Sequence, residues 1–274
     1  MEPPRRSERL RQKRDRLSDL PNAILLHIMS FMMIKDIVKT STLSKRWKNL
    51  WKHLSELKLN TFEFKKPWFF AECVSDIVSS RSKGNYPLKT LDFNRHGSFQ
   101  HKIFSDLIEH AINRGVQKLR VVVPANVGLP YCVFTSHSLT SLYISASIYD
   151  KRRTRLPNYL DLPSLTSLHL DYVGIQTDDN GFAEPFSSCN KLNNLFIKNC
   201  CFVHPRDIFL KVEGTLHVTN ATLTNLTINN YDPTYKYVIS APNLTSFIVN
   251  DSPFQPLDMP CVNIHHLHSS SSFM

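Results

Sequence analysis

Residue types that could bind a metal gather at two places in the sequence. His265, His266 and His268 form a histidine cluster, but it has no acidic or cysteine partner to complete a metal site. The segment 178–181 (Asp-Asp-Asn-Gly) is superficially similar to a calcium-binding loop, yet it lacks the alternate ligand spacing and the terminal Glu. We therefore expect a turn at 178–181, and neither a metal nor a cofactor.

Patterns typical of catalysis are not found in the sequence. Its 7 glycines are not clustered into a phosphate-binding loop. Ser, His and Asp occur widely, but no nucleophile-elbow or similar local signature supports a catalytic triad. The 6 cysteines match no zinc spacing, so we expect them to be reduced packing residues. The sequence thus predicts a protein that is not an enzyme.

Residues 17–51 carry the strongest pattern in the chain. Leu20-Pro21 opens a first helix, and apolar residues then recur at helical spacing over 24–32. A second short apolar segment follows, and a third helix begins at Ser44, which can serve as its N-cap. Three helices in so short a segment cannot bury all of this apolar surface among themselves. Part of it must therefore contact a partner.

This segment resembles the F-box in its plant form. The block TSTLSKRWKNLW at residues 40–51 is the most specific part of the likeness. The resemblance implies docking onto a Skp-type adaptor, and through it onto a cullin scaffold, in an SCF ubiquitin ligase. The residues expected to bind the adaptor are Leu20, Pro21, Ile24, Leu25, Ile28, Phe31, Val38, Leu43, Trp47, Leu50 and Trp51.

One departure from the family pattern lies at Met32-Met33, where the family usually has Leu-Pro. Without that proline the first helix could run on by a turn, which would alter the adaptor-binding surface. The alternative to a docking module is a plain three-helix bundle whose apolar stripe is only core.

From residue 54 onward, one motif recurs eight times: an apolar residue, two polar residues, an apolar residue, any residue and an apolar residue. Examples are LTSLYI from Leu139, LTSLHL from Leu165 and LNNLFI from Leu192. The spacing of the motifs brackets the period of leucine-rich repeats. The last two apolar anchors of each motif lie two residues apart on a strand and point to one side. Neighbouring repeats must therefore stack to bury them.

We predict an α/β fold, with a three-helix F-box at 15–53 and a short leucine-rich-repeat solenoid at 54–255. Its parallel sheet is expected on the concave face. Residues 68–78 and 103–112 are expected to be helices, and the later linkers, rich in Pro, Asn and Ser, to be loops. These linkers resemble the leucine-rich, RNI-like region that follows the F-box in a large plant family, whose members commonly continue into another domain. Residues 256–274 resemble neither that domain nor a capping repeat, so both a disordered polar tail and a truncated gene model remain open.

The repeat register also predicts which side chains point away from the core. They are the residues between the last two anchors of each motif. Three consecutive repeats place Tyr143, His169 and Phe196 there, on neighbouring strands. Exposed aromatic residues are the usual anchors of a protein interface, so we predict that these three bind the target. The alternatives are that a loop or the tail covers them, or that they pack only against each other.

The positive charge of the chain is concentrated toward its N-terminus. Of the net charge of +10, +9 falls on residues 1–66, which hold 16 Lys/Arg and 7 Asp/Glu. We expect a disordered basic arm at 1–14, which is a nuclear-import signal, a nucleic-acid contact or a solvated arm without a dedicated partner. The arm lacks the apolar region of a secretory signal, and 26–33 is too short to span a bilayer. We therefore expect the protein in the nucleus, the cytoplasm or both, with no membrane partner.

Three functions are compatible with these patterns. The first is a substrate-recognition subunit of an SCF-type ubiquitin ligase, in which the solenoid presents an unidentified target. The second is a basic repeat scaffold that binds nucleic acid or acidic proteins without a ubiquitin-ligase role. No aromatic platform or reading helix accompanies its basic patch, so we do not expect a nucleic-acid partner. The third is a small-ligand receptor, as some plant leucine-rich F-box proteins are, although those have many more repeats.

Overall fold

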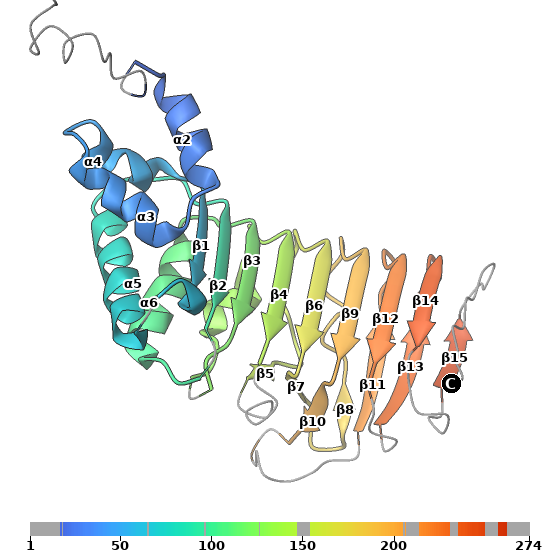
Figure 1. Ribbon diagram of the computed structural model, residues 1–274. Helices are drawn as coiled ribbons and strands as arrows, with labels where there is room; N and C mark the ends of the chain where they lie inside the picture. The colour runs from blue at the N-terminus through green and yellow to red at the C-terminus, as the bar shows by residue number, and fades with distance from the viewer. Residues whose placement is uncertain are drawn as a thin grey trace, which may run out of the picture. The chain divides into compact units, whose positions relative to one another are not determined.

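The computed structural model divides into two compact units, with the boundary between Leu54 and Ser55. The residues that it describes are 17, 19–64, 66–95, 97–125, 127–146, 154–204, 206, 214–230, 235–249 and 257–261, the last as backbone only. The basic arm expected at 1–14 lies outside these residues. In the described part of the chain, no helix is long and apolar enough to cross a membrane. The two units are described separately (Figure 1).

The first unit is helical. It consists of α2 (Asn22–Ser30), α3 (Ile34–Lys39), α4 (Trp47–Leu50) and the 3-10 helices η1 (Thr40–Thr42) and η2 (Trp51–His53). The expectation that the first helix could run on through Met32-Met33 is wrong. The amide of Met32 donates to the carbonyl of Met29 at 3.0 Å, which closes the last turn, and Met33 is extended and precedes α3. The helix therefore ends without a proline.

The second unit is built on a sheet of eight parallel strands, one for each repeat motif, which follow one another in chain order (Figure 1). They are β1 (Glu56–Asn60), β2 (Thr90–Asn94), β3 (Lys118–Val122), β4 (Ser141–Ser145), β6 (Ser167–Asp171), β9 (Asn194–Lys198), β12 (Asn225–Asn229) and β14 (Ser246–Val249). The second anchors of neighbouring motifs pair directly, for example Leu142 with Leu168 and Leu168 with Leu195. All eight second anchors are buried. The predicted repeat and its register are confirmed.

A threonine at the second position of four motifs links each of these repeats to the preceding one. Its amide and its hydroxyl both donate to the same backbone carbonyl of the preceding motif. The hydroxyl bonds run from Thr140 to Gln117 at 3.0 Å, Thr166 to Thr140 at 2.9 Å, Thr224 to Asn193 at 3.1 Å and Thr245 to Thr224 at 3.0 Å. The hydroxyl bond to the preceding repeat explains why threonine recurs beside the first leucine of the motif.

Two helices cover the first repeats, as the sequence predicts. They are α5 (Pro67–Ser82) and α6 (His101–Asn113), and two 3-10 helices, η3 (Thr61–Glu63) and η4 (Tyr131–Thr135), lie in the same part of the chain. The ring of Phe70 on α5 packs on that of Phe93 in β2 at 5.7 Å between centroids, and Phe93 packs on Phe104 of α6 at 5.3 Å. Both helices thus pack on the eight-stranded sheet through buried aromatic side chains.

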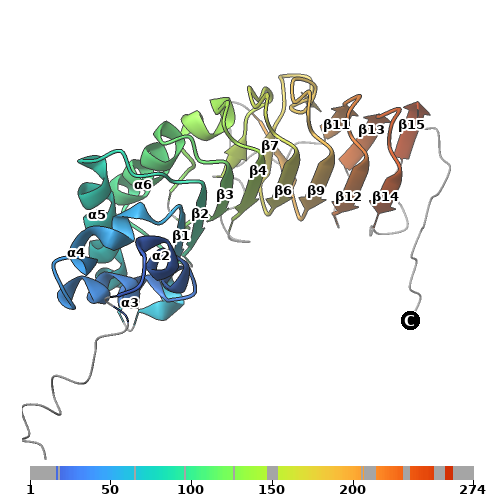
Figure 2. The ribbon, with the colours of Figure 1, turned by 90° about the horizontal axis from the view of Figure 1, so that it is seen from above.

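The linkers expected to be loops contain strands instead. Two further parallel sheets have the orders β10-β7-β5 and β15-β13-β11-β8, and Figure 2 shows them opposite the eight-stranded sheet. Their strands are β5 (Arg155–Leu156), β7 (Gly174–Gln176), β8 (Phe182–Ala183), β10 (Cys201–Val203), β11 (Gly214–Thr219), β13 (Tyr235–Ser240) and β15 (Leu257–Cys261). In β13, Tyr235, Tyr237 and Ile239 alternate with less buried residues. This period of two marks a strand, and it was visible in the sequence.

Part of the segment expected to be a disordered tail is also a strand. Leu257–Cys261 form β15, which pairs with β13 with a shift of register between Val238 and Ser240. An edge strand of a parallel sheet offers unpaired amides and carbonyls, which a further strand can satisfy. The rest of that segment lies outside the described residues.

Asn220 is expected to stabilise the second unit. It is buried, and its Nδ2 donates to the carbonyls of Phe186 and Cys189, both at 3.0 Å. Asn220→Ala leaves two carbonyls without these donors and should lower the free energy of unfolding by about 2 kcal/mol in urea denaturation. Asn225→Ala is the matched control, because Asn225 is exposed and bonds to Asn194, and its effect should stay within about 0.5 kcal/mol. Equal effects of the two changes would contradict this role.

Candidate functional site

The helical unit exposes apolar side chains on one face of α2. Ile24, Ile28 and Phe31 follow each other at spacings of four and three residues, so they share a face of the helix. Phe31 is 78% exposed, and His27 packs edge-on against its ring at 5.0 Å between centroids. Among the described residues of this unit, the exposed large apolar side chains are Leu17, Ile24, Ile28, Phe31, Met33 and Leu43. Water-exposed apolar residues clustered on one face are typical of a binding surface.

The eleven residues predicted to bind an adaptor fall into two groups. Pro21, Ile24, Ile28, Phe31 and Leu43 are exposed, while Leu20 and Val38 are half-buried. Leu25, Trp47, Leu50 and Trp51 are at most 5% exposed. For these four, the prediction of direct adaptor contact is corrected: they are buried residues that support the exposed surface. The physical reason is that one helix has both a buried and an exposed face, and a sequence motif does not separate them.

Arg46 links two parts of the helical unit that are distant in the sequence. Its Nε and Nη2 donate to Oδ1 of Asn22 at 2.9 and 2.7 Å, and Nη2 also donates to the carbonyl of Leu20. These bonds join the start of α2 to the segment before α4. Arg46 therefore fixes the position of Leu20 and Pro21, although it is exposed.

The eight-stranded sheet carries the second candidate surface. Tyr143, His169 and Phe196 occupy the same position of β4, β6 and β9, and their residues pair directly in the sheet. The rings of Tyr143 and His169 stack at 4.3 Å between centroids, with 23° between planes, and those of His169 and Phe196 at 4.1 Å and 12°. None of the three is buried. The rings therefore pack against each other and still present part of their surface to solvent.

A cation continues this stack at its β3 end. The guanidinium carbon of Arg120 lies 4.6 Å from the ring centroid of Tyr143, and Nη1 of Arg120 lies 3.2 Å from Oδ1 of Asp92 on β2. A guanidinium over an aromatic face is an attractive arrangement. Burial lowers the pKa of His169 to about 4, with the positive charges of Lys198 and Arg120 acting in the same direction. At neutral pH the stack therefore contains one cation and three uncharged rings.

Two family models match most of the chain between them. Residues 17–59 match the F-box domain, and residues 104–271 match the family described as "FBD-associated F-box protein At5g56370, LRR repeats". The second match alone covers more than half of the chain. The chain belongs to the plant F-box/LRR-repeat family.

Relatives of this F-box/LRR-repeat protein occur in Arabidopsis thaliana. Putative F-box/LRR-repeat protein At3g49150 is 30% identical over 87% of this chain and 38% of the relative. F-box/FBD/LRR-repeat protein At4g26340 is 30% identical over 86% of this chain and 55% of the relative. F-box/LRR-repeat protein At3g26922 is 32% identical over 84% of this chain and 73% of the relative. The chain thus spans only about a third to a half of the length of the first two.

Among the residues that the structure describes, no three His, Cys, Asp or Glu side chains come together as a metal site. The cluster of His265, His266 and His268 lies outside those residues.

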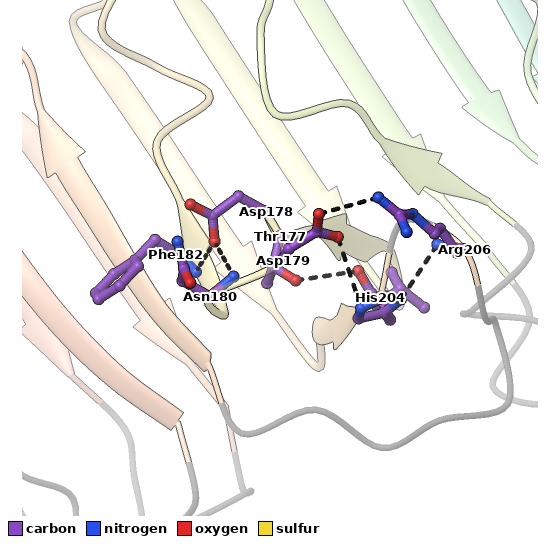
Figure 3. Close-up of polar contacts among 8 residues, drawn as sticks. Thr177, Asp178, Asp179, Asn180, Phe182, His204 and Arg206 are labelled. Carbon is purple, nitrogen blue, oxygen red and sulfur yellow. Dashed lines mark hydrogen bonds and ion pairs between the residues drawn. The ribbon is translucent and has the colours of Figure 1, made fainter.

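The segment 178–181 forms the predicted turn (Figure 3). Oδ1 of Asp178 accepts the amides of Asn180 at 2.9 Å and Phe182 at 2.8 Å. The carboxylate of Asp179 lies 3.1 Å from Nη2 of Arg206 and 3.9 Å from Nε2 of His204. Both carboxylates therefore bind groups of the protein itself. This is typical of a turn, whereas the carboxylates of a calcium-binding loop bind the ion.

Protonation of His169 is expected to destabilise the LRR unit. Its pKa is lowered from 6.5 to about 4, so the unfolded chain takes up this proton at higher pH than the folded chain. The free energy of unfolding should then fall as the pH decreases from about 6.5 to about 4. We expect a loss of about 1 kcal/mol, allowing for the partial exposure of the ring. Urea denaturation at neutral and acidic pH measures this loss of unfolding free energy, and His169→Phe should remove the part that is due to His169. If His169→Phe lost as much stability as the unmodified chain, His169 would not be the group responsible.

Proposed function

We propose that this F-box/LRR-repeat protein is the substrate-recognition subunit of an SCF-type ubiquitin ligase. Its F-box binds a Skp-type adaptor, which joins it to a cullin scaffold, and its LRR unit binds the target protein. The observation that carries the proposal is the exposed apolar face of Ile24, Ile28 and Phe31 within the residues that match the F-box. A face of this kind becomes stable when a partner removes it from water.

The mechanism is one of effective concentration. The protein supplies no catalytic group; it holds a target near the ubiquitin-charged enzyme that the same scaffold carries. Tethering makes the encounter between a target lysine and that enzyme intramolecular, which raises its rate without new chemistry. Two separate candidate surfaces on one chain, one in the helical unit and one on the eight-stranded sheet, fit this role.

The proposal is tested by assembling the complex from purified components. The full chain, expressed with a plant Skp-type adaptor, should elute with it as a single species in size-exclusion chromatography and should then bind the cullin. Failure to form the adaptor complex would overturn the proposal. Salt-sensitive retention of nucleic acid by the chain, without adaptor binding, would instead support the basic scaffold.

We also propose that the basic arm directs the protein to the nucleus. The arm carries Arg and Lys residues but no apolar anchor. Deleting residues 1–14 should therefore reduce the nuclear fraction of a fluorescent fusion in plant cells and leave adaptor co-purification unchanged. An unchanged distribution would show that the arm is only a solvated segment.

A further inference from the structure

The aromatic stack on the eight-stranded sheet ends at Phe196. Within the described residues, the ring of Phe196 has one ring contact, with His169 on β6. The residue paired with Phe196 on the other side is Thr227 of β12, and Ile248 of β14 follows in the same row. Thr227 is too small to cover an aromatic face, and Ile248 is 36% exposed. The stack therefore has the Arg120 cation at its Tyr143 end, while no aromatic ring of the described residues covers the outer face of Phe196 at the other end.

Small uncharged side chains border the stack. Ser141, Ser167 and Asn194 form the adjacent row on β4, β6 and β9, and Asn225 continues it on β12. Nδ2 of Asn225 donates to Oδ1 of Asn194 at 2.8 Å. These short side chains leave the edges of the rings accessible to a partner.

The charge around the stack is positive. From β3 to β9 the outward positions hold three cations, Lys118, Arg120 and Lys198, and one anion, Asp171. Arg120 is paired with Asp92, whereas neither Lys118 nor Lys198 forms an ion pair with any residue of the described part. Lys198 lies on the same strand as Phe196, two residues further on. Asp171 of β6 is the register partner of Lys198 and attracts it, but the two form no salt bridge. A partner that lies along the rings therefore meets, at the Phe196 end, a lysine that is free to form one.

We propose that the target segment bound by this face is acidic and carries an aromatic side chain whose ring stacks on Phe196 above Thr227. The inference rests on the proposed function, because it describes the target that the LRR unit would present. A ring placed there continues the Tyr143–His169–Phe196 series with the same stacking geometry. Acidic neighbours would pair with Lys198 and Lys118, which favours encounter and sets the orientation of the segment.

A protein segment fits this face better than a single-stranded nucleic acid. Nucleic-acid binding by stacking also needs a positively charged groove that follows the phosphate backbone. Here Asp171 interrupts the row that contains Lys198, and Arg120 is already paired with Asp92. Two lysines without a salt bridge, on separate strands, can pair with one or two carboxylates of a peptide but cannot follow a continuous phosphate backbone.

The test uses random peptides displayed on phage and selected on the full chain. Enriched peptides should share an aromatic residue with Asp or Glu beside it. Synthetic versions, titrated by fluorescence anisotropy, should bind Phe196→Ser at least about tenfold more weakly than the unmodified chain. Lys198→Gln should weaken binding less and reduce its salt dependence. Phe182→Ser is the matched control, since Phe182 is an exposed aromatic residue of β8 in another sheet, and it should leave the affinity unchanged.

Several outcomes would overturn the inference: no enriched peptide, enrichment without aromatic residues, or equal binding by Phe196→Ser and Phe182→Ser. Tighter, Phe196-dependent binding of a single-stranded RNA oligonucleotide would overturn it as well. Thermal unfolding of each variant verifies that the fold is kept. Adaptor co-purification is measured on the same proteins. If the chain binds the peptides but forms no adaptor complex, the proposed function fails and the inference on the target stands.

Discussion

Replacing Ile28 by Asp is expected to abolish co-purification of this F-box/LRR-repeat protein with a Skp-type adaptor. Ile28 lies on the exposed face of α2 and is 37% exposed, so a carboxylate there remains hydrated in the free protein. In the complex the same carboxylate would be buried against an apolar surface without a partner. Loss of such an anchor costs about 2 kcal/mol or more, which corresponds to about thirtyfold in affinity. Leu20-Pro21 replaced by Ala-Ala should act in the same direction.

The control is the same change at an exposed apolar residue of the other unit. Phe182 is 48% exposed on β8, and Phe182→Asp should leave adaptor binding unchanged. Circular dichroism of both variants verifies that helices and strands are retained. If a variant with Asp at both Ile28 and Phe31 still bound the adaptor with unchanged affinity, the F-box surface would not be the docking site.

Combining Tyr143→Ala with Phe196→Ala is expected to abolish target capture and to retain the adaptor. The two rings stack on opposite sides of His169, so the pair of changes removes two of the three rings of the stack. Aromatic residues at the centre of an interface commonly contribute about 2 kcal/mol or more each, although such effects do not add independently. Proximity labelling in plant cells under proteasome inhibition identifies the proteins captured by the unmodified chain and by the variant.

A second double variant separates a local effect from a general loss of aromatic surface. Tyr131 and Phe182 are both exposed aromatic residues outside the eight-stranded sheet. Tyr131→Ala with Phe182→Ala should capture the same targets as the unmodified chain. Survival of target capture in the Tyr143 and Phe196 variant would place the target surface elsewhere on the LRR unit.

The repeat architecture was predictable because its signal is local and is repeated eight times. Each motif holds two anchors at a period of two, and all repeats are equivalent, so the motif gives both the strand and its register. The helices α5 and α6 were predictable from their apolar spacing. Of the strands opposite, β5, β7, β8 and β10 are only two or three residues long, and so short a segment cannot show a period of two. The longer strands β11 and β13 do alternate between more and less buried residues, and this signal in the linkers was overlooked.

In the F-box, the sequence identified the family and the apolar positions but not their roles. Trp47, Leu50 and Trp51 have the spacing of a single helix face, and such a face serves equally as core or as interface. Burial places them inside, while Ile24 and Phe31 remain outside. The contact of Arg46 with Asn22 joins residues 24 positions apart, and no local pattern marks it.

The sequence by itself determined which residues form the outward row of the sheet, because side-chain direction in a strand alternates with every residue. Only the tertiary structure decided that Tyr143, His169 and Phe196 form one stack with Arg120 at its end. The rings lie 26 and 27 residues apart in the chain and meet because the strands pair in parallel and in register. The lowered pKa of His169 has the same origin, since burial between neighbouring rings and the charges of Lys198 and Arg120 exist only when the repeats are stacked.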